Sequence, residues 1–107
     1  MAAKENDPPT LILTSLAAGP KHGYALQQDI EAFAGVTLGP GTLYGAITRL
    51  EQRGLIEPTE STDERRRPYR ITAPGAEALE RTLCELRLIV DEGTARLRRL
   101  APLGEQA

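Results

Sequence analysis

The sequence predicts a mainly helical α+β domain that ends in one long helix, and three observations predict this fold class. Residues 8–53 contain three short helical patterns that each end at a glycine. Residues 55–72 contain two short strand patterns around a charged turn. Residues 74–101 carry apolar residues at heptad spacing. With 107 residues, 40% of them hydrophobic and 26% charged, the chain is expected to form one folded domain.

The first two helices should supply much of the core. The first is expected from Pro8 or Pro9 to Ala18, because Asp7 can cap it and Gly19-Pro20 stops it. The second is expected from His22 to Ala34 and ends at Gly35. The apolar residues predicted to pack are Leu11, Ile12, Leu13 and Leu16 in the first helix, and a stripe of Tyr24, Leu26, Ile30 and Phe33 in the second.

The third helix, expected from Pro40 to Arg53 and ended by Gly54, begins with residues that disfavour helices, GPGTLYG. Proline is tolerated at the first helical position, because its missing N–H would be unpaired there in any case. The spacing of Leu43, Ile47 and Leu50 places these side chains in the core. The opposite face and its flanks then consist of Gly41, Thr42, Tyr44, Gly45, Thr48, Arg49 and Gln52.

This bare face of the third helix suits contact with DNA. Glycines let the backbone approach closely, and the N–H groups of a helix N-terminus attract phosphate. A hydroxyl, a phenol and a guanidinium can bond to phosphates or base edges. Taken alone, the stretch is equally compatible with surface glycines that the helix merely tolerates.

The strand patterns run from Leu55 to Thr59 and from Pro68 to Thr72. Prolines in both favour an edge hairpin, and three short helices followed by a hairpin are the layout of a winged helix-turn-helix. Tyr69 is expected to pack the hairpin onto the helices. The basic run Arg65, Arg66 and Arg67 favours phosphate contacts, with a solvated turn as the alternative.

The long helix, expected from Pro74 to about Ala101, carries a heptad seam that indicates a coiled contact between two chains. Packing back on the first helix of the same chain is the alternative. The seam consists of Leu79, Leu83, Leu86, Val90, Gly93, Leu97 and Leu100. The predicted organisation is therefore a flexible N-terminal arm (1–9), a winged helix-turn-helix domain (10–73), a dimerisation helix (74–101) and a tail (102–107).

Composition excludes several classes of function. No apolar run reaches the roughly 18 residues of a membrane helix, so no membrane partner is expected. One cysteine, Cys84, fits a reducing cytoplasm, and one cysteine with one histidine offers no metal site. No catalytic constellation or cofactor site is present. The net charge of −2 counts mildly against nucleic acid and keeps a protein–protein interaction module as the alternative function.

Several motifs together resemble the PadR family of bacterial transcriptional regulators. They are KHGYAL at 21–26, PGTLY at 40–44, RLE at 49–51, GLI at 54–56 and RRRPYRITAPG at 65–75. The resemblance covers about residues 10–80. It implies a cytoplasmic, nucleoid-associated homodimer whose third helices enter successive major grooves of a pseudo-palindromic operator in double-stranded DNA. It also implies repression of its own or a neighbouring gene, relieved by a small molecule.

Carried over by residue, the resemblance makes Thr42 and Tyr44 recognition contacts and the three arginines a basic wing. Lys21, His22 and Tyr24 are weaker candidates for contacts with the DNA backbone; helix entry or core packing are the other roles open to His22 and Tyr24. The chain departs from the family pattern at Gly45, where proline is common, at Gly39, where serine is common, and at the acidic wing tip Asp63-Glu64. Since no aromatic residue follows Tyr69, any effector site on the long helix would be aliphatic and would suit a small hydrophobic molecule.

Overall fold

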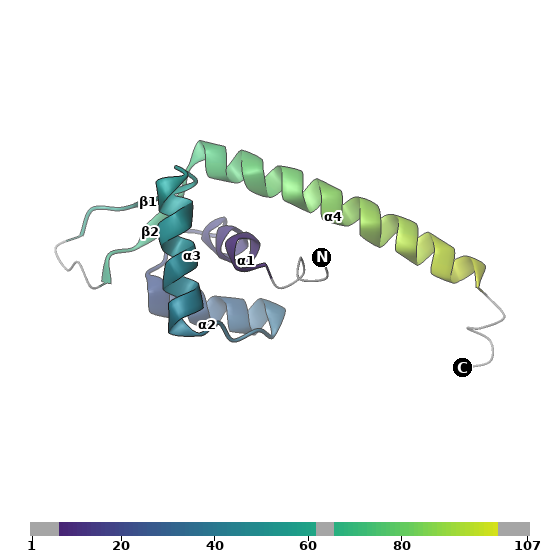
Figure 1. Cartoon of the computed structure of the whole chain (residues 1–107), viewed down its shortest axis with the longest axis horizontal. Coiled ribbons are helices and arrows are strands. Elements are labelled where there is room, and N and C mark those ends of the chain that lie inside the picture. The colour runs from purple at the N-terminus through teal and green to yellow at the C-terminus, as the bar shows by residue number, and fades with distance from the viewer. Residues whose placement is uncertain (1–6, 62–65, 101–107) are drawn as a thin grey trace.

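A computed structural model describes residues 7–61 and 66–100 of the chain. Figure 1 shows the short helices and the hairpin gathered in one body, with a long helix that extends away from it. The elements in chain order are α1 (Pro8–Leu16), α2 (Gly23–Ala34), α3 (Pro40–Gln52), β1 (Ile56–Pro58), β2 (Tyr69–Ile71) and α4 (Ala73–Arg99). The predicted fold class, a winged helix-turn-helix with a long C-terminal helix, is confirmed.

The core lies around α1, which contacts α2, α3, α4 and β2. Ile12 and Leu16 on this helix are almost completely buried, as are Leu26, Ile30, Leu43, Ile47, Leu50 and Ile56 on the surrounding elements. Full burial of one such side chain contributes about 1.5–3 kcal/mol. The core therefore fixes the orientation of α3 relative to the other helices.

The predicted apolar stripe on α2 is wrong for two of its four residues. The Tyr24 and Phe33 side chains are 64% and 48% exposed, whereas Leu26 and Ile30 are buried. Tyr24 lies two residues before Leu26, about 200° around the helix axis, so the two cannot share a face. Phe33 precedes Ala34, which is the residue of that turn that packs against the core.

The hairpin is short and attached to the helical body. Its strands pair antiparallel, with Ile56 opposite Ile71 and Glu57 opposite Arg70. The Lys21 N–H donates to the Tyr69 carbonyl oxygen (3.1 Å), and the Tyr69 N–H donates to the Lys21 carbonyl oxygen (2.9 Å). The main chain at Lys21, just before α2, therefore pairs with β2 on the side away from β1. The hairpin of β1 and β2 is called the wing below.

The start of α4 is bonded to the end of α3. Thr72 is the N-cap of α4, and its hydroxyl accepts a hydrogen bond from the Gly75 N–H (3.1 Å) while donating to the Gly54 carbonyl oxygen (2.7 Å). Gly54 ends α3 with a φ of 75°, a left-handed conformation that glycine adopts without steric cost. The hairpin, α3 and α4 thus meet at Thr72.

The helices of the structure begin and end at other residues than the predicted segments do; α4, for example, begins at Ala73. Pro8 and Pro9, which the predicted arm included, are the first two residues of α1. Residues 1–6 of that arm, Ala101 and the whole predicted tail lie outside the described residues.

Candidate nucleic-acid interface

The exposed face of α3 has the composition that the sequence predicts. Leu43, Ala46, Ile47 and Leu50 are buried. The residues on the other side are Gly41, Thr42, Tyr44, Thr48 and Arg49, which are exposed, and Gly45, which is half-buried. Figure 1 shows α3 at the front of the body, with α1 beside it and α2 crossing behind its lower end. The helix therefore presents one continuous polar and glycine-rich surface.

The N-terminus of α3 is bare. Its N-cap is Gly39, Pro40 follows in the first turn, and no side chain caps the N–H groups there. A Cβ added to Gly39 or Gly41 would meet no atom within 4 Å. The positive end of the helix dipole is therefore open to an anion such as a DNA phosphate.

Further along α3, small residues leave room for the polar side chains. A Cβ on Gly45 would lie 3.6 Å from Nη1 of Arg49, so the guanidinium lies over the bare backbone of Gly45. The Thr48 hydroxyl donates to the Tyr44 carbonyl oxygen (2.9 Å), which leaves the oxygen of that hydroxyl available as an acceptor. The Tyr44 side chain is 52% exposed.

The wing presents fewer free arginines than the sequence suggests. Arg65, like the acidic tip Asp63-Glu64, lies outside the described residues. Arg66 is exposed, whereas Arg67 is half-buried and lines a hollow together with Pro58, Thr59, Glu60 and Ser61. Arg70 forms an exposed pair with Glu57 across the strands, with 2.8 Å between Nε and Oε2.

The residues before and at the start of α2 divide between structural and surface positions. The Lys21 ammonium donates to the Ser15 carbonyl oxygen (2.6 Å) and lies 3.8 Å from Oδ2 of Asp29. His22 is the N-cap of α2, and its Nδ1 accepts a hydrogen bond from the Ala25 N–H (3.4 Å). Tyr24 is exposed, and its hydroxyl accepts from Gln28 (3.0 Å). Helix entry is therefore the role that the structure gives His22.

The predicted seam on α4 changes character along the helix. Leu79 is only 7% exposed and belongs to the core of its own chain, so it offers almost no surface to a partner. Most of the apolar residues further along are exposed, with Leu83 at 46%, Val90 at 59% and Leu97 at 67%, whereas Leu86 is half-buried. Leu88 and Ile89, which the seam omitted, are exposed as well. Their positions outside the a/d pattern make the apolar surface of α4 wider than a narrow heptad stripe.

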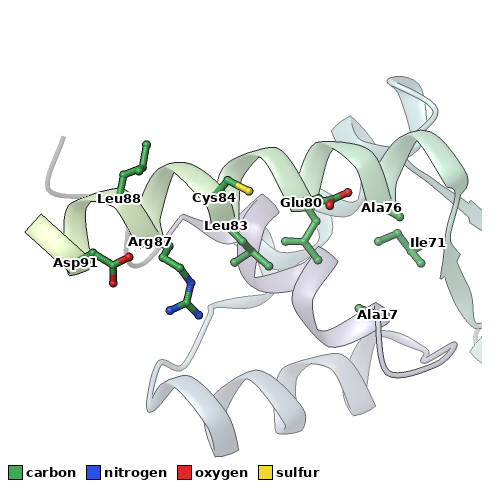
Figure 2. A pocket seen from close by; sticks show the side chains of 10 residues that line it. Ala17, Ile71, Ala76, Glu80, Leu83, Cys84, Arg87, Leu88 and Asp91 are labelled. Carbon is green, nitrogen blue, oxygen red and sulfur yellow. The ribbon is translucent and has the colours of Figure 1, made fainter.

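An aliphatic hollow lies where α4 leaves the body, with a volume of about 630 Å³. Figure 2 shows Ala17 and Ile71 on one side and residues of α4 on the other. The lining from α4 consists of Ala76, Leu79, Glu80, Leu83, Cys84, Arg87, Leu88 and Asp91. The lining contains no aromatic side chain.

In the part of the chain that the structure describes, no three or more His, Cys, Asp or Glu side chains gather in a way that could hold a metal ion. Within that same part, none of the helices combines the length and the apolar character needed to cross a membrane.

The fold defines a class: a winged helix-turn-helix protein, whose third helix here presents an exposed polar and glycine-rich face. The chain belongs to the PadR-like family of transcriptional regulators, since the model of that family matches residues 12–81, well over half of the chain. Members of this family are DNA-binding regulators of transcription and not enzymes.

Solved structures share the fold. A transcriptional regulator from Clostridium thermocellum is 30% identical, with a TM-score of 0.72 over 80% of this chain and 85% of that one. A PadR family transcription regulator from hypervirulent Clostridium difficile R20291 is 26% identical, with a TM-score of 0.71 over 84% of this chain and 97% of that one.

A relative in sequence comes from a mobile element. An uncharacterized 37.1 kDa protein in transposon TN4556 of Streptomyces fradiae is 49% identical over 78 residues, which are 73% of this chain. The match spans 22% of that relative's length, so the chain corresponds to about a fifth of it.

Proposed function

We propose that the chain is a dimeric repressor that binds a pseudo-palindromic operator in double-stranded DNA. The observation that carries this proposal is the exposed face of α3, whose N-terminus no side chain caps. A helix of this kind can enter the major groove with its glycines against the DNA and its polar side chains at base edges and phosphates. Repression of its own or a neighbouring gene, and association with the nucleoid, follow from such binding.

Two groups of contacts are proposed at the operator. Thr42 and Tyr44, at the head of α3, discriminate between operator sequences, and Thr48 and Arg49 extend that contact along the same face. Arg66, with Arg65 and Arg67 beside it in the chain, contacts phosphates next to the groove. Because phosphate contacts carry little sequence information, the wing supplies affinity and α3 supplies specificity.

The dimer is proposed to form through α4. Beyond Leu83 this helix exposes a run of large apolar side chains that its own fold does not cover. Full burial of one large apolar side chain contributes about 1.5–3 kcal/mol. Burial of several such side chains from each of two chains is therefore enough to hold a stable dimer. The seam then comprises Leu83, Leu86, Val90, Gly93, Leu97 and Leu100.

An effector, where one acts, is proposed to occupy the aliphatic hollow at the base of α4 (Figure 2). Its volume of about 630 Å³ is in the range of small-molecule sites. The apolar floor with Glu80, Arg87 and Asp91 at its edge suits a small hydrophobic molecule with one or two polar groups.

A titration against the DNA upstream of the chain's own gene tests the function. Fluorescence anisotropy is measured at about 50 mM and about 200 mM salt, with unrelated DNA as competitor. The proposal expects binding that resists the competitor and weakens steeply with salt. Binding that the competitor abolishes at both salt concentrations contradicts operator recognition, and favours a partner protein on the α3 face instead.

Variants separate the two groups of contacts. Arg66→Ala should weaken binding to all sequences alike and reduce the salt slope by about 0.9 for each chain, since one phosphate contact is lost. Thr42→Val should instead change the ranking of operator variants and leave the salt slope as it is. If Arg66→Ala leaves both affinity and salt slope unchanged, the wing assignment is wrong.

A further inference from the structure

Gly23, the first residue of α2, lies against the side chain of Tyr44 on α3. A Cβ built on Gly23 would lie 2.7 Å from Cζ and 2.8 Å from Cε1 of the Tyr44 ring, with the phenol oxygen also in contact. These separations are shorter than the non-bonded contacts that real Cβ atoms make. Gly23 is buried although it begins its helix, whereas half of the Tyr44 side chain is covered and half is exposed. The two residues therefore touch, 21 positions apart in the chain.

The backbone at Gly23 gives no reason for a glycine. The glycines with positive φ in the described part of the chain are Gly19, Gly35 and Gly54, and Gly23 is not among them. Alanine is the better helix former at a position of ordinary φ. The reason lies in packing, because any side chain at position 23 would occupy the space that the Tyr44 phenol fills.

The surroundings hold this contact in place from two sides. His22 caps α2 directly before Gly23, through the hydrogen bond from the Ala25 N–H to Nδ1. Lys21 is bonded through its main chain to Tyr69 of the wing. Burial raises the pKa of the Tyr69 phenol, the Glu51 carboxylate and the Tyr44 phenol raise it further, and Arg67 lowers it. Tyr44 is therefore close enough to Tyr69 to affect its pKa. The Tyr44 ring thus lies at the junction of α2, α3 and the wing.

We propose that Gly23 is a positioning residue for operator recognition: the missing side chain forms a seat for the Tyr44 phenol and fixes where its hydroxyl meets the DNA. This inference rests on the proposed function, because it takes Tyr44 as an operator contact. A tyrosine on an exposed helix face otherwise samples several rotamers. A ring already seated in one of them loses less conformational freedom when DNA binds.

The seat predicts the effect of one methyl group. In Gly23→Ala the fold is retained, because the ring at the far end of a flexible side chain can swing away while α2 keeps its backbone. The Tyr44 hydroxyl is then displaced from its position at the junction. Operator affinity should fall about tenfold or more, since a dimer loses the contact twice.

A double-variant cycle separates this role from a merely structural one. Anisotropy titrations compare the parent protein, Gly23→Ala, Tyr44→Ala and the combined variant. If Gly23 acts through the ring, Gly23→Ala weakens operator binding in the parent and has no further effect once Tyr44→Ala has removed the ring. An equal loss from Gly23→Ala in both backgrounds overturns the proposal.

A second readout needs no DNA. The chain has three tyrosines and no tryptophan, so tyrosine labelled with ¹³C in the ring gives three sets of NMR signals, which Tyr24→Phe and Tyr69→Phe assign. Gly23→Ala should move the Tyr44 signals, whereas Gly39→Ala adds the same methyl group in open space and should leave them in place. Unmoved Tyr44 signals in Gly23→Ala overturn the seat.

The two readouts also distinguish this inference from the proposed function. If Tyr44 signals move in Gly23→Ala but neither Gly23→Ala nor Tyr44→Ala changes operator affinity, the seat exists and Tyr44 is not an operator contact, which overturns the positioning role. If Tyr44→Ala weakens operator binding while the signals do not move in Gly23→Ala, operator recognition stands and Gly23 has no part in it.

Discussion

Tyr69 is the first residue of β2, and its side chain is half-buried against the core. Burial raises the pKa of its phenol above the ordinary value of 10.0. The Glu51 carboxylate and the Tyr44 phenol raise this pKa further, whereas Arg67 lowers it. The folded chain therefore favours the neutral phenol at a residue whose main chain is bonded to Lys21, just before α2.

This raised pKa predicts how stability depends on pH. A group whose pKa is higher in the folded state contributes stability that is complete below the unfolded pKa of about 10 and is lost as the pH rises through the folded value. Urea unfolding should therefore show a fall in the free energy of unfolding between about pH 9 and about pH 11 that is smaller in Tyr69→Phe. Tyr24→Phe, at an exposed position, is the control and should keep the full fall. Equal curves for Tyr69→Phe and the parent contradict the prediction.

At the scale of single residues, the sequence predicted what depends on local spacing. Leu43, Ile47 and Leu50 repeat every three or four residues, and this spacing alone placed the opposite face of α3 at the surface. Contacts between distant residues left no such signal. Nothing in the sequence links Gly23 to Tyr44 or Lys21 to Ser15, because these pairs meet only when the helices pack. The motif alone therefore predicts Lys21 as a contact with the DNA backbone, whereas in the fold its ammonium donates to the Ser15 carbonyl oxygen.

Lys21 joins three elements. Its ammonium bonds to the end of α1 at Ser15 and approaches Asp29 of α2, and its main chain pairs with Tyr69 of β2. The Ser15 hydroxyl, which is buried, donates to the same Asp29 carboxylate (2.6 Å). This cluster holds the helical body to the wing from inside the fold.

Lys21→Met should therefore affect stability more than DNA binding. Removing the ammonium leaves the Ser15 carbonyl oxygen without this donor and should lower the free energy of unfolding by about 1–3 kcal/mol in urea titrations. The operator affinity and the salt slope of the folded protein should not change. Arg66→Ala is the matched comparison. Because Arg66 is exposed, this variant should keep its free energy of unfolding and lose operator affinity and salt slope. A reduced salt slope in Lys21→Met shows that Lys21 contacts the DNA backbone instead.

The elements themselves were predicted in the correct order and type, with differences at their ends. The strands have three residues each in place of five. Thr59 and Thr72 still donate to the carbonyl oxygens of Pro68 and Leu55 just beyond the strand ends, but Pro68 has no N–H with which to donate in return. α1 ends at Leu16 in place of Ala18, because the chain tightens there through a bond from the Ala18 N–H to the Ser15 carbonyl oxygen. Element ends depend on such local bonds, which spacing patterns do not specify.

For the whole molecule, α4 determines the proposed assembly. Its first turns pack against α1, and Leu79 completes the core there. From Leu83 onward most of its large apolar side chains are exposed in the single chain, although Leu86 is half-buried. The heptad spacing predicted an uncovered stripe on the helix, but the sequence could not show where packing within the chain stops and the open surface begins.

Val90→Glu should separate the two chains. The substitution places two carboxylates near each other in the middle of the proposed seam, where neither has a partner, and the lost apolar contact adds to the penalty. Sedimentation velocity should show a monomer in place of the dimer at micromolar concentration. Arg98→Glu, which changes charge more but lies off the seam, should remain dimeric. A Val90→Glu protein that also stays dimeric contradicts the proposed interface.

The joint at Thr72 has a geometric consequence for the spacing of operator half-sites. One residue separates β2 from α4. The helix is therefore rigidly connected at its base, and a small change of angle there becomes a large displacement at its far end. Its 27 residues span about 40 Å, and a tilt of about 5° at the joint would displace the far end by about 3.5 Å. One base-pair step in DNA is about 3.4 Å. In the proposed dimer, the angle at this threonine therefore sets the distance between the two copies of α3. A change of only a few degrees alters that distance by about one base-pair step.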